Sequence, residues 1–146
     1  MTSIRSRPVM ATLLISLVAC ATNIIAISQS DAQIHNESEI RNQIIDGLRN
    51  AQGVQVVVVE VFRESGAFPD NNDVAGLPPP EELVSEYVDY VEINDGGAIA
   101  IFFGRNADET IKEKMIVLAP FITEGQVKFR CFSPDISKSY LPSACR

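Results

Sequence analysis

An uncharged apolar segment near the N-terminus, Val9 to Ile27, most constrains how this chain can fold. Arg5 and Arg7 precede it, and positive charge at that position keeps the N-terminal end in the cytoplasm and sends the following residues outside. As a helix the segment would extend roughly 28 Å, close to the hydrocarbon thickness of a bilayer. We therefore expect residues 1–32 to be a signal peptide or membrane anchor, and residues 33–146 to be one extracytoplasmic globular domain.

The sequence leaves the fate of this leader open. Ser30-Asp31-Ala32 places small residues where a secretory peptidase would release a chain that starts at Gln33. Leu17-Val18-Ala19-Cys20 resembles a bacterial lipobox, after whose cleavage Cys20 would carry a lipid. If neither cleavage occurs, residues 9–27 would remain as a membrane helix, and the membrane would be a partner of the chain.

The composition argues against several classes of function. With 12 Lys+Arg against 19 Asp+Glu and a net charge of -7, the chain has no surplus of cations to neutralise phosphates. Three cysteines and a single histidine, His35, are too few for a zinc site of Cys and His ligands or for a His-based catalytic dyad. We therefore expect no nucleic acid partner, no metal or other cofactor, and no chemistry that depends on a histidine dyad.

The first part of the domain has the apolar spacing of an amphipathic helix. Apolar residues recur there at gaps of three or four: Ile40, Ile44, Leu48, Ala51, Val54, Val58 and Val61. Asn36, with Glu39 three residues later, forms a capping box that predicts the start of the helix. Gly66 followed by Pro69 predicts its end.

One stretch of this helix has a second interpretation. Val54 to Val61 is β-branched almost throughout, so by itself it would form a buried strand after a turn at Gly53. The helical spacing favours one long helix instead.

The second part of the domain changes to an apolar period of two. A proline-rich surface loop from Asp70 to Pro80 leads into a predicted short helix from Pro80 to about Val88. Asn94 to Gly97 and Thr123 to Gln126 are predicted hairpin turns. A meander of short strands needs a cover for its apolar face, so we expect an α+β roll in which the long N-terminal helix packs on an antiparallel sheet of about four strands. The predicted strands are Tyr87 to Ile93, Ala98 to Phe103, Met115 to Ile122 and Val127 to Phe132.

Two of the cysteines lie in the C-terminal part of the chain. Cys131 and Cys145 can form a disulfide in an oxidising compartment, which leaves Cys20 in the leader as the odd thiol. In the chain-entropy model, closing a loop of about 15 residues stabilises a fold by roughly 3 kcal/mol. The segment between them, Phe132 to Ala144, is either a staple for a small domain or an exposed binding loop. The candidate binding residues in it are Asp135, Ser137, Lys138 and Ser139.

Three segments of the chain resemble the type IV pilin (fimbrial protein) family: the helix exit Gly66-Ala67-Phe68-Pro69, the strand Val127-Lys128-Phe129-Arg130-Cys131, and the closing Tyr140-Leu141-Pro142-Ser143-Ala144-Cys145-Arg146. The family pairs a cysteine on the last strand with one near the C-terminus, which implies the Cys131–Cys145 bridge. The resemblance also implies a pilin-like roll at the cell surface, a structural or accessory role in type IV pili and in cell adhesion, and other pilin subunits or surface receptors as partners.

The leader departs from the pattern of that family. Pilins carry a Gly-Phe-Thr-Leu-Ile-Glu-like start that is cut before the phenylalanine. An ungapped count places Ala11 at the processing glycine and Ser16 at the glutamate, and a start at Thr12 would follow from such processing. A carboxylate in an apolar bundle must find a partner and can thereby specify register, whereas a serine demands much less. The alternative function is therefore a secreted or lipid-anchored binding module with a pilin-like head that does not polymerise.

Overall fold

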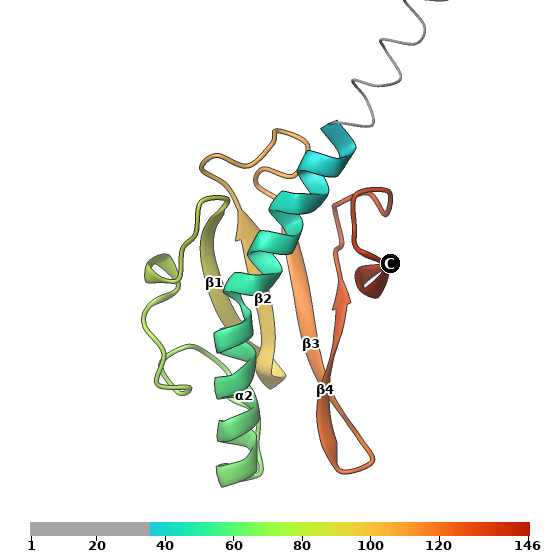
Figure 1. The fold of residues 1–146 in the computed structure, drawn as a ribbon. Helices are drawn as coiled ribbons and strands as arrows, with labels where there is room; N and C mark the ends of the chain where they lie inside the picture. The colour runs from blue at the N-terminus through green and yellow to red at the C-terminus, as the bar shows by residue number, and fades with distance from the viewer. Residues whose placement is uncertain (1–35) are drawn as a thin grey trace, which may run out of the picture. The chain divides into compact units, whose positions relative to one another are not determined.

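The computed structural model describes residues 36–146, in which a long helix crosses one face of a four-stranded antiparallel sheet (Figure 1). This arrangement confirms the expected α+β roll. The predictions for the leader, including Cys20, His35, the apolar segment Val9 to Ile27 and the boundary at residue 33, lie outside the described residues. Within residues 36–146, no helix combines the length and the apolar character that a membrane span needs.

The helix is already formed at Asn36 and ends at Ser65, and its second part is α2 (Gln52–Ser65). At the junction of the two parts the N–H of Ala51 donates to the carbonyl of Gly47 at 3.2 Å, which continues the helical hydrogen bonding. The capping box predicted at Asn36 is wrong, because this residue lies inside the helix and not before it.

The end of the helix is confirmed at Gly66, which has a left-handed φ of 77° and donates its N–H to the carbonyl of Phe62. The strand interpretation of Val54 to Val61 is wrong, since these residues lie within α2. Val54 and Val58 are four residues apart and both are buried, so the helical spacing turns both side chains to the same side. Tertiary packing therefore overrides the strand preference of β-branched residues.

The sheet consists of β1 (Val88–Asn94), β2 (Ala98–Phe103), β3 (Met115–Thr123) and β4 (Gln126–Phe132), in that spatial order. All neighbouring strands are antiparallel. The four predicted strands are thus confirmed to within one residue at each end. Both hairpin turns are confirmed as well: Gly96 and Gly125 each have a φ of 74°, which glycine adopts without steric cost.

The short helix predicted from Pro80 to about Val88 is wrong in its length. The structure has a single 3-10 turn, η1 (Pro80–Glu82), closed by the N–H of Leu83 donating to the carbonyl of Pro80. Val88 already belongs to β1, where it pairs with Phe103 and is fully buried. Burying this side chain in the sheet stabilises the extended conformation by about 1.5–3 kcal/mol, more than a short helix could offer.

The core lies between the helix and the sheet, and the C-terminal tail contributes to it. The helix packs tightly against β2 at Gly47, where a Cβ atom would lie 2.8 Å from Cε1 of Phe103. This contact requires glycine because any side chain would collide with the ring. The buried side chains of the core include Ile44, Val54, Val58, Val91, Ile101, Ile116, Leu118, Ile136 and Leu141.

Candidate functional site

The predicted disulfide joins Cys131 on β4 to Cys145 in the 3-10 turn η3 (Ser143–Cys145), with their Cα atoms 4.4 Å apart. The tail between them folds back beside β4 (Figure 1). Ile136 and Leu141 insert into the core from this tail, so the loop is held by burial as well as by the covalent bond. The staple interpretation of the loop is therefore structurally sound, whatever else the loop does.

Hydrogen bonds fix the first turn of this loop. The hydroxyl of Ser133 donates to the carbonyl of Met115 at 2.6 Å and accepts the N–H of Ile136 at 3.0 Å. The N–H of Met115 in turn donates to Oδ1 of Asp135 at 3.3 Å. Asp135, one of the four candidate binding residues, thus has a structural contact that ties the loop to β3.

The other three candidates, Ser137, Lys138 and Ser139, are all exposed and lie together on the outside of the loop. The hydroxyls of Ser137 and Ser139 are 3.1 Å apart and share a hydrogen bond. Arg41, far away in the sequence, donates from Nη2 to the carbonyl of Ser139 at 2.9 Å and so ties the loop to the helix. The fold presents one cation and two hydroxyls on a loop held at both ends, an arrangement that suits binding with little loss of conformational entropy.

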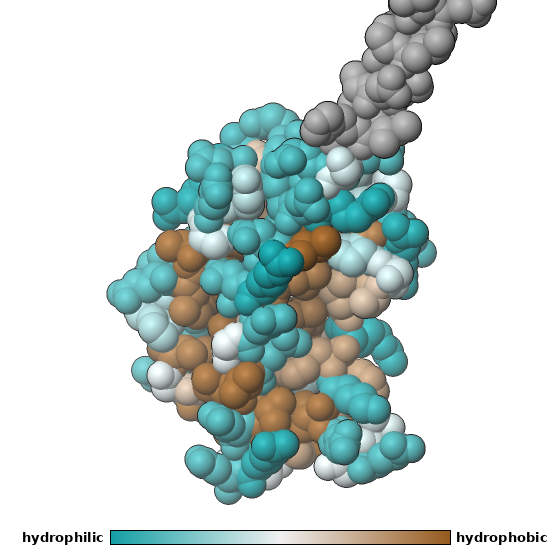
Figure 2. Space-filling view, in the orientation of Figure 1, coloured by the Kyte–Doolittle hydropathy of each residue, from teal (hydrophilic) through white to brown (hydrophobic). Residues whose placement is uncertain are grey.

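The outward side of α2 forms a second surface of interest. Figure 2 shows hydrophobic side chains gathered over the lower half of α2, where Val56 is 57% exposed. A shallow groove of about 290 Å³ runs between this helix and β4. Its floor includes Phe129, and Glu60 and Arg63 bring charges of both signs to it. An exposed valine on a helix is ordinary by itself, but here it borders a groove in which another apolar side chain could be buried.

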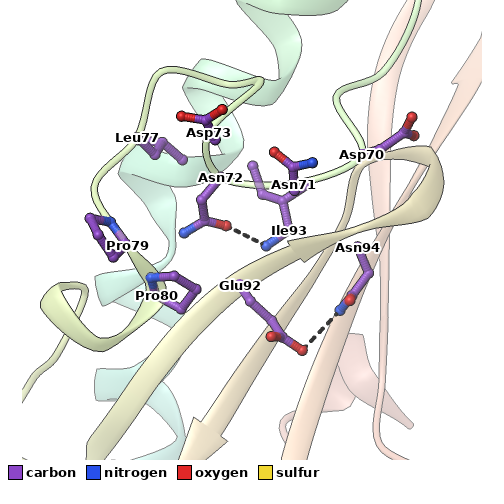
Figure 3. Close-up of a pocket in the computed structure, with 10 residues that line it drawn as sticks. All are labelled: Asp70, Asn71, Asn72, Asp73, Leu77, Pro79, Pro80, Glu92, Ile93 and Asn94. Carbon is purple, nitrogen blue, oxygen red and sulfur yellow. Dashed lines mark hydrogen bonds between the residues drawn. The ribbon is translucent and has the colours of Figure 1, made fainter.

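A pocket of about 530 Å³ lies beside β1, under the loop that leaves the helix (Figure 3). Its walls combine the carboxylates of Asp70, Asp73 and Glu92 with apolar surface that includes two prolines. The residues that line it are Asp70, Asn71, Asn72, Asp73, Leu77, Pro79, Pro80, Glu92, Ile93 and Asn94. Within residues 36–146, no group of three or more His, Cys, Asp or Glu side chains is placed to hold a metal ion.

Asn72 holds this loop against the outer edge of β1, and Figure 3 shows its side chain pointing at Ile93. Its Oδ1 accepts the N–H of Ile93 at 2.7 Å, and its Nδ2 lies 3.2 Å from the carbonyl of Val91 and 3.1 Å from that of Pro78. Only 5% of Asn72 is exposed. One amide side chain therefore takes the place of a neighbouring strand and satisfies buried backbone groups that would otherwise be unpaired.

The sequence did not predict that Asn72 binds the edge of β1. Asp70 to Pro80 is predicted only as a surface loop, because a polar, proline-rich stretch carries no information on its partners. The two strand residues that Asn72 binds are 19 and 21 positions away. The only signal in the sequence is an amide residue in a loop that precedes an apolar strand, and this signal is common to many loops.

Comparison with known proteins identifies the family of this chain. Residues 41–146 match the pilin family, which is described as a bacterial filament protein. The chain is 28% identical to the type IV major pilin protein PilE1 of Neisseria gonorrhoeae over 73% of this chain and 74% of that protein. It is 31% identical to a fimbrial protein of Neisseria meningitidis serogroup B over 73% of this chain and 75% of that protein. The chain therefore belongs to the pilin family.

Proposed function

We propose that this chain is a structural subunit of a type IV pilus, displayed at the cell surface, with no catalytic role of its own. The observation that carries the proposal is the outward side of α2, where Val56 is exposed beside the groove lined by Val59 and Phe129. Membership of the pilin family and the similarity to a type IV major pilin and to a fimbrial protein support the same role.

In a filament, a neighbouring subunit would cover the exposed part of this helix. Burial of an apolar side chain at such a contact stabilises it by about 25 cal/mol for each Å² removed from water. Glu60 and Arg63 carry opposite charges at the groove. A neighbouring subunit would dock in the register that places its own charges opposite unlike ones, because like charges repel.

The test is Val56→Glu, with Val74→Glu as its matched control. Both valines are highly exposed, at 57% and 60%, but Val74 lies in the loop before η1 and not on the helix. We expect Val56→Glu to abolish filaments in electron micrographs of the native host, since a carboxylate in the contact would be desolvated. Val74→Glu should leave them intact. Equal filament yield from both variants, at equal amounts of folded chain, would contradict the proposed contact.

Cell adhesion through the disulfide loop is the finer part of this proposal. Lys138→Ala removes an exposed cation from the loop, and Arg49→Ala removes an exposed cation from the helix. We expect bacteria carrying Lys138→Ala to attach less to a cultured cell layer, with an unchanged number of filaments. Bacteria carrying Arg49→Ala should attach like the wild type. Equal attachment of the two variants would leave the loop with its structural role alone.

A binding module that does not polymerise is the second candidate, and Ala11 and Ser16 at the family's processing and glutamate positions favour it. The intact mass of the chain from its native host distinguishes the two. A start at Gln33 would remove the whole apolar segment that a filament core needs, and a lipidated start at Cys20 would remove residues 9–19 of it; either start would support the module. A start at Thr12 would support the pilus subunit.

A further inference from the structure

The face of the sheet that points away from the helix carries a largely apolar band. According to the strand register, one row across this face consists of Glu92 on β1, Ala100 on β2, Val117 on β3 and Phe132 on β4. Phe132 is 42% exposed, and Phe121, further along β3, is 38% exposed. The long helix lies over the opposite face of the sheet (Figure 1). Exposed aromatic side chains near the apolar centre of a face are typical of an interaction surface.

The two edges of this face carry opposite charges. At the β1 edge, Glu92 adjoins the acidic pocket to which Asp70 and Asp73 also contribute. At the β4 edge, Lys128 and Arg130 are exposed, and the guanidinium of Arg130 lies 5.7 Å from the ring centroid of Phe121. A surface with an acidic edge, an apolar centre and a basic edge is complementary to itself after a half-turn.

We propose that this face binds the same face of a second copy of the chain, with the acidic β1 edge of each copy over the basic β4 edge of the other. A two-fold axis parallel to the strands produces this arrangement. It also places β2 of one copy over β3 of the other, where Val117 is partly exposed; Ala100 beside it is already buried within its own chain. Arg130 is two residues from Phe132 on β4, a shift of about 7 Å, so its guanidinium has to leave the ring of Phe121 and turn along the strand to reach Glu92 of the second copy.

The contact area between two copies is small, so a single contact is weak. Four strands spaced about 4.8 Å apart offer less area than the standard interface of about 800 Å² on each partner, so a single pair of heads associates weakly. Copies displayed side by side on a surface or filament would gain avidity, because each contact made raises the effective concentration for the next. This contact involves only the globular domain, and it can form whether or not the chain forms filaments.

Charge reversal in the full-length chain tests the proposal. We expect the wild type in detergent to show a concentration-dependent monomer–dimer equilibrium by sedimentation velocity, and added salt to weaken it. Glu92→Lys places two cations together, and Arg130→Glu places two carboxylates together. Each variant alone should dimerise about tenfold more weakly than the wild type.

The decisive arm is an equimolar mixture of the two variants. In a mixed pair, Lys at position 92 faces Glu at position 130, and native Glu92 faces native Arg130 on the other side of the two-fold axis. We therefore expect the mixture to recover the affinity of the wild type as a heterodimer. The double variant Glu92→Lys/Arg130→Glu should recover it as a homodimer for the same reason.

Charge reversals away from the face are the controls, and Glu64→Lys and Arg49→Glu on the exposed side of the helix should leave the affinity unchanged. All variants carry the same leader, so association through the apolar segment would be equal in all of them. A monomeric wild type at every concentration, unaffected single variants, or a mixture as weak as its components would each overturn the proposal. The melting temperature of each variant, measured in parallel, excludes loss of the fold as the cause of weaker pairing.

Discussion

The two edges of the sheet are closed in different ways. At β1 a single amide, that of Asn72, bonds to Val91 and Ile93 and is almost completely buried. At β4 a covalent bond between Cys131 and Cys145 ties down the tail. The amide stabilises the folded state by satisfying buried polar groups, whereas in the chain-entropy model the disulfide acts mainly on the unfolded chain. An exposed sheet edge can pair with a strand of another chain. In this domain a loop held by Asn72 covers the β1 edge, and a tail held by the disulfide lies beside the β4 edge.

Breaking the disulfide at the β4 edge should destabilise the fold most. Cys131→Ser should lower the free energy of unfolding by about 2–5 kcal/mol, because the open tail gains conformational freedom in the unfolded state. Urea denaturation of the variant and of the wild type, each with and without reductant, measures this loss. Cys145→Ser should match it, and reductant should change only the wild type. A wild type that unfolds at the same urea concentration with and without reductant would contradict the role of the bridge.

Removal of the Asn72 amide at the β1 edge should lower the free energy of unfolding by less than removal of the disulfide. Asn72→Ala leaves the N–H of Ile93 and the carbonyl of Val91 unpaired, which should cost about 2–3 kcal/mol in unfolding free energy. Hydrogen exchange at the Ile93 amide should accelerate, since its acceptor is lost. Asn71→Ala in the same loop removes only an exposed contact to the N–H of Val74 and should cost less than about 1 kcal/mol. Equal losses from the two variants would mean that Asn72 does not close the edge.

Ser133 provides the non-covalent part of the β4 edge. Ser133→Ala removes the bonds to Met115 and Ile136 and should cost about 1 kcal/mol in unfolding free energy. Measured in the Cys131→Ser background, the same change shows how the two constraints combine. Additive losses would indicate that each acts alone, whereas a smaller loss in the double variant would show that the turn depends on the disulfide.

A still smaller change should appear in the pH dependence of stability, through Tyr90 on β1. Partial burial, followed by the charges of Glu92 and Asp89, raises the pKa of Tyr90 above its ordinary value of 10.0. The folded state therefore holds this proton longer than the unfolded chain, so the stability that Tyr90 contributes is present below pH 10 and is lost as the pH rises through the folded-state pKa. Denaturation between pH 9 and 12 should show a shallower fall for Tyr90→Phe than for the wild type. Identical profiles would remove Tyr90 as a contributor.

Local patterns predicted most of the elements. The short apolar run Ala98 to Phe103 and the glycine turn at Gly125 each place one element, because such runs and turn chemistry depend on neighbouring residues only. The helix spacing also resolved Val54 to Val61 correctly. The predictions at Asn36 and at Pro80 to Val88 failed, since a cap or a first turn proposes a boundary that packing elsewhere can move.

The candidate site was predictable to a smaller extent. The pairing of Cys131 with Cys145 was predicted and is confirmed, and the exposed loop residues Ser137 to Ser139 lie where the sequence placed them. The contribution of Arg41 to that loop was not predictable, because its hydrogen bond to Ser139 spans 98 residues. The groove of α2 depends likewise on β4, which supplies Phe129 from a distant part of the chain.

Two glycines of the helix, Gly47 and Gly53, are equivalent in the sequence pattern but not in the folded chain. Periodicity placed Gly47 and Gly53 in one amphipathic helix, and in sequence terms both are weak helix formers of equal standing. In the folded chain a Cβ at Gly47 would collide with Phe103, whereas nothing lies within 4 Å of one at Gly53. The difference comes from β2, and contacts of this kind are set by which distant surfaces meet and not by the residues beside them.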